Sequence, residues 1–120
     1  MPKRIAPVWS AAKTRQGRRR LYLSLLPAIR RIARKSGYAI GVHGSMTRDL
    51  DLIAVPWRRG AVMAETLAYR IHHATSTRTC TRPELKKFMK RKPYGRVAYT
   101  LIIGSEGAYI DLSIMAANRK

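Results

Sequence analysis

Residues 41–57, GVHGSMTRDLDLIAVPW, contain a Gly-Ser pair, two aspartates two positions apart and a hydrophobic run. Carboxylates are scarce in this chain, which has 25 Lys and Arg but only 6 Asp and Glu. Aspartate is also depleted in β-strands, yet Asp49 and Asp51 open a segment, residues 49–55, whose hydrophobic residues predict a strand that ends at Pro56. We infer that these two carboxylates have a specific role.

The third and last aspartate, Asp111, occurs in a second segment of the same kind. Residues 95–103 and 108–114 are rich in β-forming side chains and are joined by a Gly-Ser-Glu-Gly turn, which predicts an antiparallel hairpin. Side chains alternate along a strand, so Asp49 and Asp51 share one face, and Asp111 lies on the polar face of its own strand. If these strands are neighbours, all three carboxylates meet on one side of the sheet.

The rest of the chain predicts helices and one further strand. An apolar helical period runs from Tyr22 to Ala33, with Ser24 as N-cap, Pro27 in the first turn and Gly37 at the end. The other predicted elements are a strand over 38–42, a helix over 61–74, and a short helix opened by a capping box of Thr81 and Glu84 and carrying Leu85, Phe88 and Met89 on one side.

The beginning of the chain has a different composition. Residues 1–20 contain seven Lys and Arg and no regular apolar period, which predicts an extended, flexible basic arm. Residues 21–120 are long enough for one core, and their pattern predicts a single α+β domain. We therefore expect a small mixed β-sheet covered by helices, preceded by the basic arm.

The net charge indicates the chemistry of the partners. A formal charge of +19 and a pI near 11.4 predict a polyanionic partner, and we expect a nucleic acid, either RNA or DNA. No run of about 18 uncharged apolar residues is present, so we expect no membrane insertion. Cys80 is the sole cysteine, so no internal disulfide can form, and a reducing cytoplasm is the expected location.

Three converging carboxylates repel one another and need a counterion. A hard divalent cation with oxygen ligands, Mg²⁺ or Mn²⁺, meets that need, and Asp49, Asp51 and Asp111 are its candidate ligands and the candidate catalytic residues. Gly44 and Ser45 predict a small-residue turn whose backbone N–H groups can approach phosphate oxygens. The pattern thus joins a candidate metal site to a candidate phosphate site.

Basic residues near the predicted strands are candidates for phosphate binding. Arg48 directly precedes the aspartate pair, and Lys92 and Arg96 flank Tyr94 in the turn KPYGR before the hairpin. These side chains either clamp phosphates and stack on a base or form a solvated basic face. His43, just before the Gly-Ser pair, either binds an anion or acts as an acid near the phosphate site, or it is a structural hydrogen-bonding residue.

The order Gly-Ser, Asp-x-Asp on a strand, and a later hydrophobic-Asp-hydrophobic strand resembles the nucleotidyltransferase superfamily of the DNA polymerase β type. More narrowly, HGSMTRDLDLIAVPW, KPYGRVAYTLIIG and AYIDLS resemble small nucleotidyltransferase-like proteins of tailed bacteriophages and prophages, over roughly residues 38–115. The resemblance implies that Asp49 and Asp51 bind metal, that Asp111 completes the triad, and that the Gly-Ser pair contacts a nucleoside triphosphate. It also implies transfer of a nucleoside monophosphate to a nucleic acid or small-molecule acceptor, in the bacterial host cytoplasm if a phage encodes the chain.

Two departures from the superfamily keep other functions open. Only three residues separate Ser45 from Asp49, fewer than in most active members, and the chain ends six residues after Ile114, without the helical domain by which larger members hold the base. We expect either a partner protein or a second copy to complete the base-binding surface, or a non-catalytic, basic, phage-associated nucleic-acid-binding protein that keeps the fold. Phosphodiester hydrolysis by the same carboxylates, as in a nuclease, is a third hypothesis.

Overall fold

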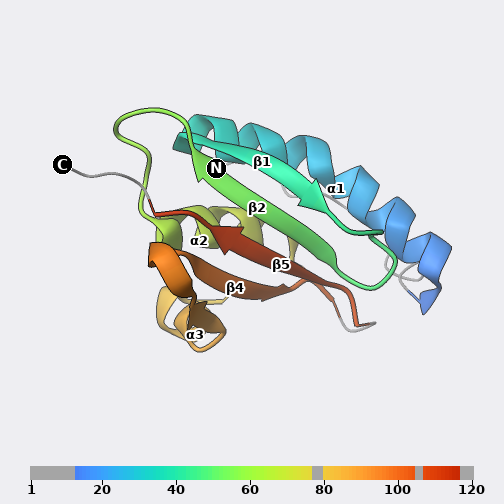
Figure 1. Ribbon diagram of the computed structural model, residues 1–120. Helices are drawn as coiled ribbons and strands as arrows, with labels where there is room; N and C mark the ends of the chain where they lie inside the picture. Colours follow the sequence, from blue (N-terminus) through green and yellow to red (C-terminus); the bar gives the residue numbers. More distant parts are fainter. Residues whose placement is uncertain (1–12, 77–79, 105–106, 117–120) are drawn as a thin grey trace.

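A computed structural model describes residues 13–76, 80–104 and 107–116 of the chain (Figure 1). Helices and strands are mixed along the sequence, as expected of the α+β class. In chain order the elements are α1 (Arg15–Ser36), β1 (Tyr38–His43), β2 (Leu50–Pro56), α2 (Ala64–Thr75), α3 (Arg82–Lys86), β3 (Met89–Arg91), the 3₁₀ turn η2 (Pro93–Gly95), β4 (Val97–Ile102) and β5 (Tyr109–Ile114).

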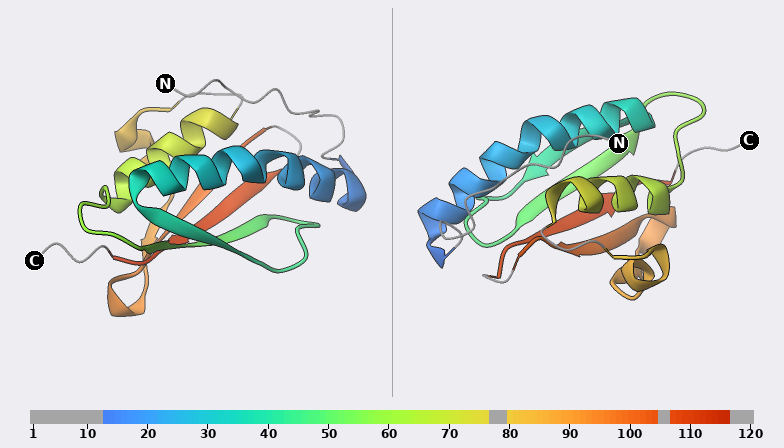
Figure 2. Two further views of the ribbon diagram at one scale, coloured as in Figure 1. Left: turned by 90° about the horizontal axis from the view of Figure 1, so that it is seen from above. Right: turned by 180° about the vertical axis from the view of Figure 1, so that it is seen from behind.

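The strands form one mixed sheet in the order β1-β2-β5-β4-β3. β2 and β5 run parallel at its centre, and the other neighbouring pairs are antiparallel. Both α1 and α2 lie on one face of the sheet, and within the described residues no helix covers the other face (Figure 2). The predicted α+β class and mixed sheet are confirmed, with the helices on a single face. We call the opposite face of the sheet, which α1 and α2 do not cover, the open face.

Alternation along the central strands separates the core from the open face. The even-numbered residues of β2 and β5 pack against the helices, and the odd-numbered ones, including Asp51 and Asp111, point the other way. Every buried residue of these two strands is apolar, so the carboxylates are kept out of the core. The buried set is Leu50, Leu52, Ala54, Ile110, Leu112 and Ile114.

Helix α1 begins earlier than the sequence predicted. Thr14 is its N-cap and accepts a hydrogen bond from the Gly17 N–H at 2.9 Å, so residues 15–20, predicted as part of a flexible arm, are helical. Residues 1–12 of that predicted arm lie outside the described residues. Pro27 therefore falls in the helix interior, where the missing N–H and the ring clash cost about 3 kcal/mol.

The prediction of Ser24 as N-cap is also wrong. Ser24 lies inside α1, where its hydroxyl donates to the Leu21 carbonyl at 2.6 Å. The helix tolerates Pro27 because its apolar stripe is long, and each large buried apolar side chain contributes about 1.5–3 kcal/mol. The buried stripe is Leu21, Tyr22, Leu25, Leu26, Ile29, Ile32 and Ala33.

Gly37 ends α1, as predicted, and turns the chain into β1. Its φ of +96° is left-handed, and its N–H donates to the Arg34 carbonyl at 3.1 Å. A Cβ at this position would lie 2.7 Å from the Cα of Ala61, so the close approach of the segment before α2 also requires glycine.

The capping box at Thr81 and Glu84 is confirmed, but the helix that it opens is shorter than predicted. The Thr81 N–H donates to Glu84 Oε1 at 3.0 Å, yet α3 ends at Lys86. Phe88, predicted on its apolar side, is 47% exposed, and Met89 begins β3. The reason is the pairing of β3 with β4, a strand pairing that the local pattern does not contain.

None of the helices in the described part of the chain has both the length and the apolar character that crossing a bilayer requires.

Candidate metal centre

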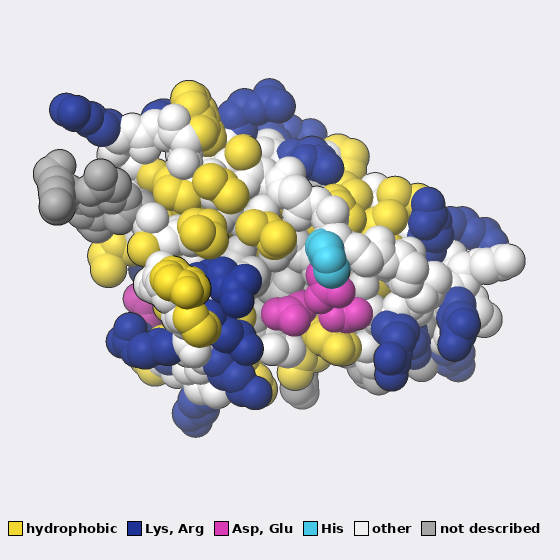
Figure 3. Space-filling view, in the orientation of Figure 1, with side chains coloured by type: hydrophobic (Ala, Val, Ile, Leu, Met, Phe, Trp, Pro, Cys, Tyr) yellow, Lys and Arg dark blue, Asp and Glu magenta, His cyan; other side chains and the backbone are white. Residues whose placement is uncertain are grey.

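One row of residues crosses the open face at the carboxylates. The strand registers pair His43 of β1 with Asp51 of β2, Asp51 with Asp111 of β5, and Asp111 with Thr100 of β4. In Figure 3 the acidic side chains form a compact magenta group beside a histidine, with Lys and Arg at some distance on either side. The carboxylates thus lie at the centre of the sheet, on the face that the helices leave free.

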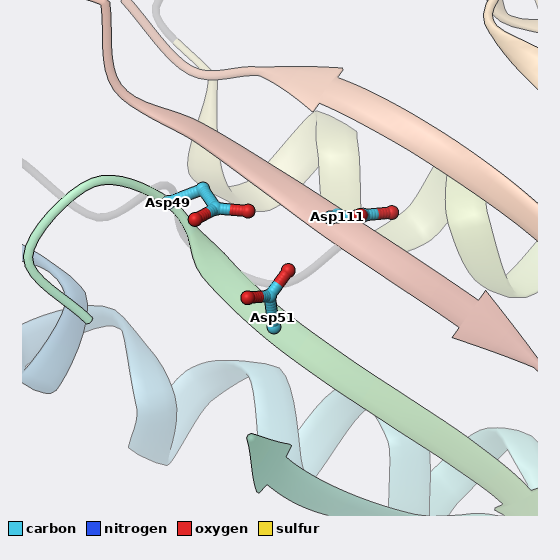
Figure 4. A group of neighbouring side chains, drawn as sticks. All are labelled: Asp49, Asp51 and Asp111. Atoms are coloured by element: carbon cyan, nitrogen blue, oxygen red, sulfur yellow. The ribbon is translucent and has the colours of Figure 1, made fainter. Parts of the chain in front are cut away.

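Asp49, Asp51 and Asp111 are close enough to share one ion. One carboxylate oxygen from each lies within 4.8 Å of the others, and all three side chains are half-buried. Asp51 and Asp111 come from adjacent parallel strands, and Asp49 lies just before β2 rather than within the strand as predicted (Figure 4). The convergence predicted from strand alternation is confirmed, while the role of these side chains as metal ligands stays a prediction.

Burial and the two neighbouring carboxylates disfavour the ionisation of Asp51. Partial burial, followed by a hydrogen bond with Asp49 and the charges of Asp49 and Asp111, raises the pKa of Asp51 from 3.8 to about 6. The charge of His43 acts in the opposite direction and is a smaller effect. Three clustered carboxylates offer the oxygen ligands that a hard divalent cation prefers, and these side chains would hold Mg²⁺ or Mn²⁺.

The Gly-Ser turn lies directly against this group. Gly44 has φ +84°, and a Cβ there would lie 3.4 Å from Asp51 Oδ2, so the backbone passes close to the carboxylate. The exposed hydroxyl of Ser45 is 2.8 Å from that of Thr47, and Met46 has a left-handed backbone with φ +61°. The short link predicted to be unusual is thus a tight turn with one strained residue, and it brings the Gly-Ser pair beside the carboxylates.

Tyr22 of α1 links the residue before Asp49 to the start of β5, the strand that carries Asp111. Its buried hydroxyl donates to the Arg48 carbonyl at 2.8 Å and accepts the Tyr109 N–H at 3.2 Å. It therefore fixes the residue before Asp49 relative to the start of the strand that carries Asp111. Sequence reasoning assigned Tyr22 only to the apolar stripe; the missed signal was its hydroxyl, which needs a partner when the ring is buried.

The predicted basic site residues lie at two separate places. Arg48 is exposed and adjacent to Asp49, and on the same side Arg19 of α1 donates to the Ser45 carbonyl at 3.5 Å. Lys92 and Arg96 instead flank η2. Arg96 is four residues along the chain from Thr100, the partner of Asp111, a separation of about 13 Å in an extended strand. Arg48 is therefore next to Asp49 along the chain, and the structure sets Lys92 and Arg96 apart from the triad.

No protein-family model matches the chain, and the comparisons with curated proteins and with solved structures found no match either.

Proposed function

We propose that this chain is a metal-dependent nucleotidyltransferase that moves a nucleoside monophosphate from a nucleoside triphosphate to an acceptor hydroxyl. The observation that carries the proposal is the convergence of Asp49, Asp51 and Asp111, the chain's only aspartates, within 4.8 Å on the open face. The Gly-Ser turn beside them and the resemblance of the motif order to the polymerase β type support it further.

The proposed transfer exchanges one phosphorus–oxygen bond for another. The acceptor oxygen forms a bond to the α-phosphorus, the bond from that phosphorus to the bridging α,β-oxygen breaks, and pyrophosphate leaves with the electron pair. The hydroxyl proton passes to a carboxylate and then to solvent. Bound Mg²⁺ or Mn²⁺ supplies activation of the attacking hydroxyl and neutralisation of the charge on the leaving pyrophosphate.

The chain's own residues have separate parts in this proposal. The three aspartates bind the cation, and one of them also accepts the proton of the attacking hydroxyl. The N–H groups around Gly44 and Ser45 and the guanidinium of Arg48 bind phosphate oxygens. Tyr22 is a positioning residue, because it touches the backbone on both sides of the centre. The setting that we propose is a cytoplasm, where the single thiol of Cys80 stays reduced.

Label transfer tests the proposal. The purified chain is given Mg²⁺ or Mn²⁺, each α-labelled nucleoside triphosphate, and single-stranded RNA, single-stranded DNA or a small hydroxyl compound as acceptor. We expect transfer that is lost in Asp51→Asn and Asp111→Asn and kept in Glu65→Gln, which removes a carboxylate beside Arg82 outside the centre. Equal label in the wild-type chain and Asp51→Asn would overturn the proposal, and release of label from a labelled strand would indicate a nuclease instead.

A second candidate is a nucleic-acid-binding protein without catalysis. The charge of +19 favours it, together with the Lys and Arg side chains on both sides of the acidic group in Figure 3. It predicts salt-sensitive binding to nucleic acid that Asp51→Asn leaves unchanged or strengthens, since the variant removes a repulsive charge. Filter-binding assays over a range of salt concentrations separate it from the first proposal.

A further inference from the structure

The turn between β3 and β4 holds a tyrosine out in solvent. Tyr94 is 97% exposed, and its backbone is left-handed, with φ 66° and ψ 32°. A bulky residue rarely adopts this conformation, because its Cβ crowds the backbone. Gly95 follows with φ +74°, and the Lys92 N–H closes the turn by donating to the Arg96 carbonyl at 2.8 Å. The core gains nothing from this aromatic ring, so its strained, exposed position indicates a ligand.

Cations surround the ring. Six of the eleven residues in 86–96 are Lys or Arg, and no acidic residue occurs between Glu84 and Glu106. Figure 3 shows Lys and Arg side chains gathered with hydrophobic ones at this corner, over α3 and the start of β4. The side chains are exposed except for that of Arg96, which is half-buried; they are Lys86, Lys87, Lys90, Arg91, Lys92 and Arg96.

Part of this cationic corner shares the open face with the carboxylates. Lys90 pairs with Ala98, while Met89 and Val97, each one residue away, pack against the core. Alternation therefore turns Lys90 to the open face, and the extended backbone of Arg96 continues the same alternation.

Phe88 connects the corner to the metal centre. The Thr100 N–H donates to the Phe88 carbonyl at 3.1 Å, and Thr100 is the partner of Asp111 in the next strand. Phe88 is thus two strand spacings, about 10 Å, from Asp111. Its ring is 47% exposed, so a second aromatic surface lies two strands from the carboxylates.

We propose that Phe88, Lys90, Lys92, Tyr94 and Arg96, which we call the Tyr94 platform, bind a single-stranded nucleic acid. The rings stack on unpaired bases and the cations contact the phosphates, the combination by which proteins bind single strands without reading sequence. A duplex does not present base faces to such a ring. That the bound strand is the acceptor rests on the proposed function; the binding itself does not.

An acidic segment of a protein is the competing occupant. The cations alone would suffice to bind an acidic segment. Such a partner would not explain why a tyrosine is held exposed in a left-handed backbone. The combination of charge with two exposed rings therefore favours the nucleic acid, and binding to an acidic peptide becomes an outcome of the test.

Fluorescence anisotropy with the full chain in EDTA measures the platform without the metal centre. The probes are labelled single-stranded RNA and DNA of mixed sequence, the matching duplexes, and poly-glutamate, at about 0.2 M salt to suppress non-specific binding. Tyr94→Gly removes the ring and relieves the strain, so the variant folds, and Tyr94→Phe keeps the ring. Trp57→Ala removes another exposed aromatic ring, 56% exposed, at a different corner.

We expect Tyr94→Gly to weaken single-strand binding by about 5- to 100-fold, with little change for the duplex, while Tyr94→Phe and Trp57→Ala stay near the wild-type affinity. Arg96→Gln should reduce the slope of log K against log salt by about 1. Lys35→Gln on α1 should change the preference for single strands over the duplex less than Arg96→Gln does. Unchanged single-strand affinity in Tyr94→Gly, equal affinity for single strand and duplex, or tighter binding of poly-glutamate would each overturn the platform.

The two proposals fail separately. If label transfer depends on Asp51 but Tyr94→Gly does not weaken single-strand binding, the proposed enzyme stands and the Tyr94 platform is refuted. If Tyr94→Gly weakens single-strand binding but no label is transferred to any acceptor, the Tyr94 platform stands and the proposed enzyme is refuted.

Discussion

Replacing Asp51 by Asn should stabilise the metal-free protein at neutral pH, although it removes a side chain of the proposed centre. The pKa of Asp51 is raised from 3.8 to about 6, first by partial burial and then by its carboxylate neighbours. At about 1.4 kcal/mol per pKa unit, the ionised form is disfavoured by about 3 kcal/mol for a fully shielded group. Asp51 is only half-buried, so solvent screening reduces the expected gain to about 1 kcal/mol.

The stability that Asp51 contributes depends on pH with a definite sign. Because the folded protein holds the Asp51 proton more tightly than the unfolded chain, the stability due to this group is fully present below pH 3.8 and is lost as the pH rises through about 6. Asparagine does not titrate. The difference in unfolding free energy between Asp51→Asn and the wild-type chain should therefore be near zero at pH 3.8 and below, and should grow to about 1 kcal/mol by pH 7.

Urea unfolding in EDTA at a series of pH values measures this difference, provided that the slopes of the two proteins agree. Glu65→Gln is the matched control, since it also removes one negative charge but from a carboxylate 3.8 Å from Arg82. It should not stabilise the protein at any of these pH values, because it removes the ion-pair partner of Arg82 rather than a carboxylate held among other carboxylates. An Asp51→Asn variant that is no more stable than wild type at pH 7 would refute the argument from carboxylate repulsion.

Four further predictions follow from the same contacts. Adding Mg²⁺ should raise the melting temperature of the wild-type chain and not that of Asp51→Asn; equal shifts in thermal denaturation would contradict a cation at the triad. Tyr22→Phe should lower stability by about 1 kcal/mol in urea, because the Tyr109 N–H and the Arg48 carbonyl lose their partner, and should reduce label transfer; normal transfer would mean that Tyr22 positions nothing. Gly37→Ala should cost at least about 2 kcal/mol, from a left-handed backbone and a clash with the segment before α2; wild-type stability in urea would show that this segment can shift. Thr81→Ala removes the capping hydroxyl of α3 and should cost about 1 kcal/mol by the same measurement; unchanged stability would show that this cap does not stabilise the fold.

Local patterns predicted most of the strands and the acidic group. Alternating side chains identify Asp51 and Asp111 as residues opposite a buried face, and the few carboxylates of the chain make their grouping conspicuous. The parallel pairing of Asp51 with Asp111 depends on packing between segments far apart in the sequence, so local reasoning could state it only as a condition.

The errors have the same origin. The sequence contains a cap at Thr14 as well as a serine at Ser24, and only the packing of the long apolar stripe on the sheet decides that the helix runs through Pro27. β3 is three residues long and exists because the turn at Tyr94 brings it to β4. The contact of the Tyr22 hydroxyl with the two halves of the centre likewise needs the tertiary structure.

The parallel pairing of β2 with β5 also sets an order of assembly during synthesis. Asp49 and Asp51 leave the ribosome with the second strand, whereas Asp111 belongs to the last of the five strands in the described chain. The loop closed by this pairing is the longest among the neighbouring strands, and such closures come late in folding. The nascent chain therefore carries two carboxylates without the third, and the complete acidic group forms only in the step that joins the two halves of the sheet.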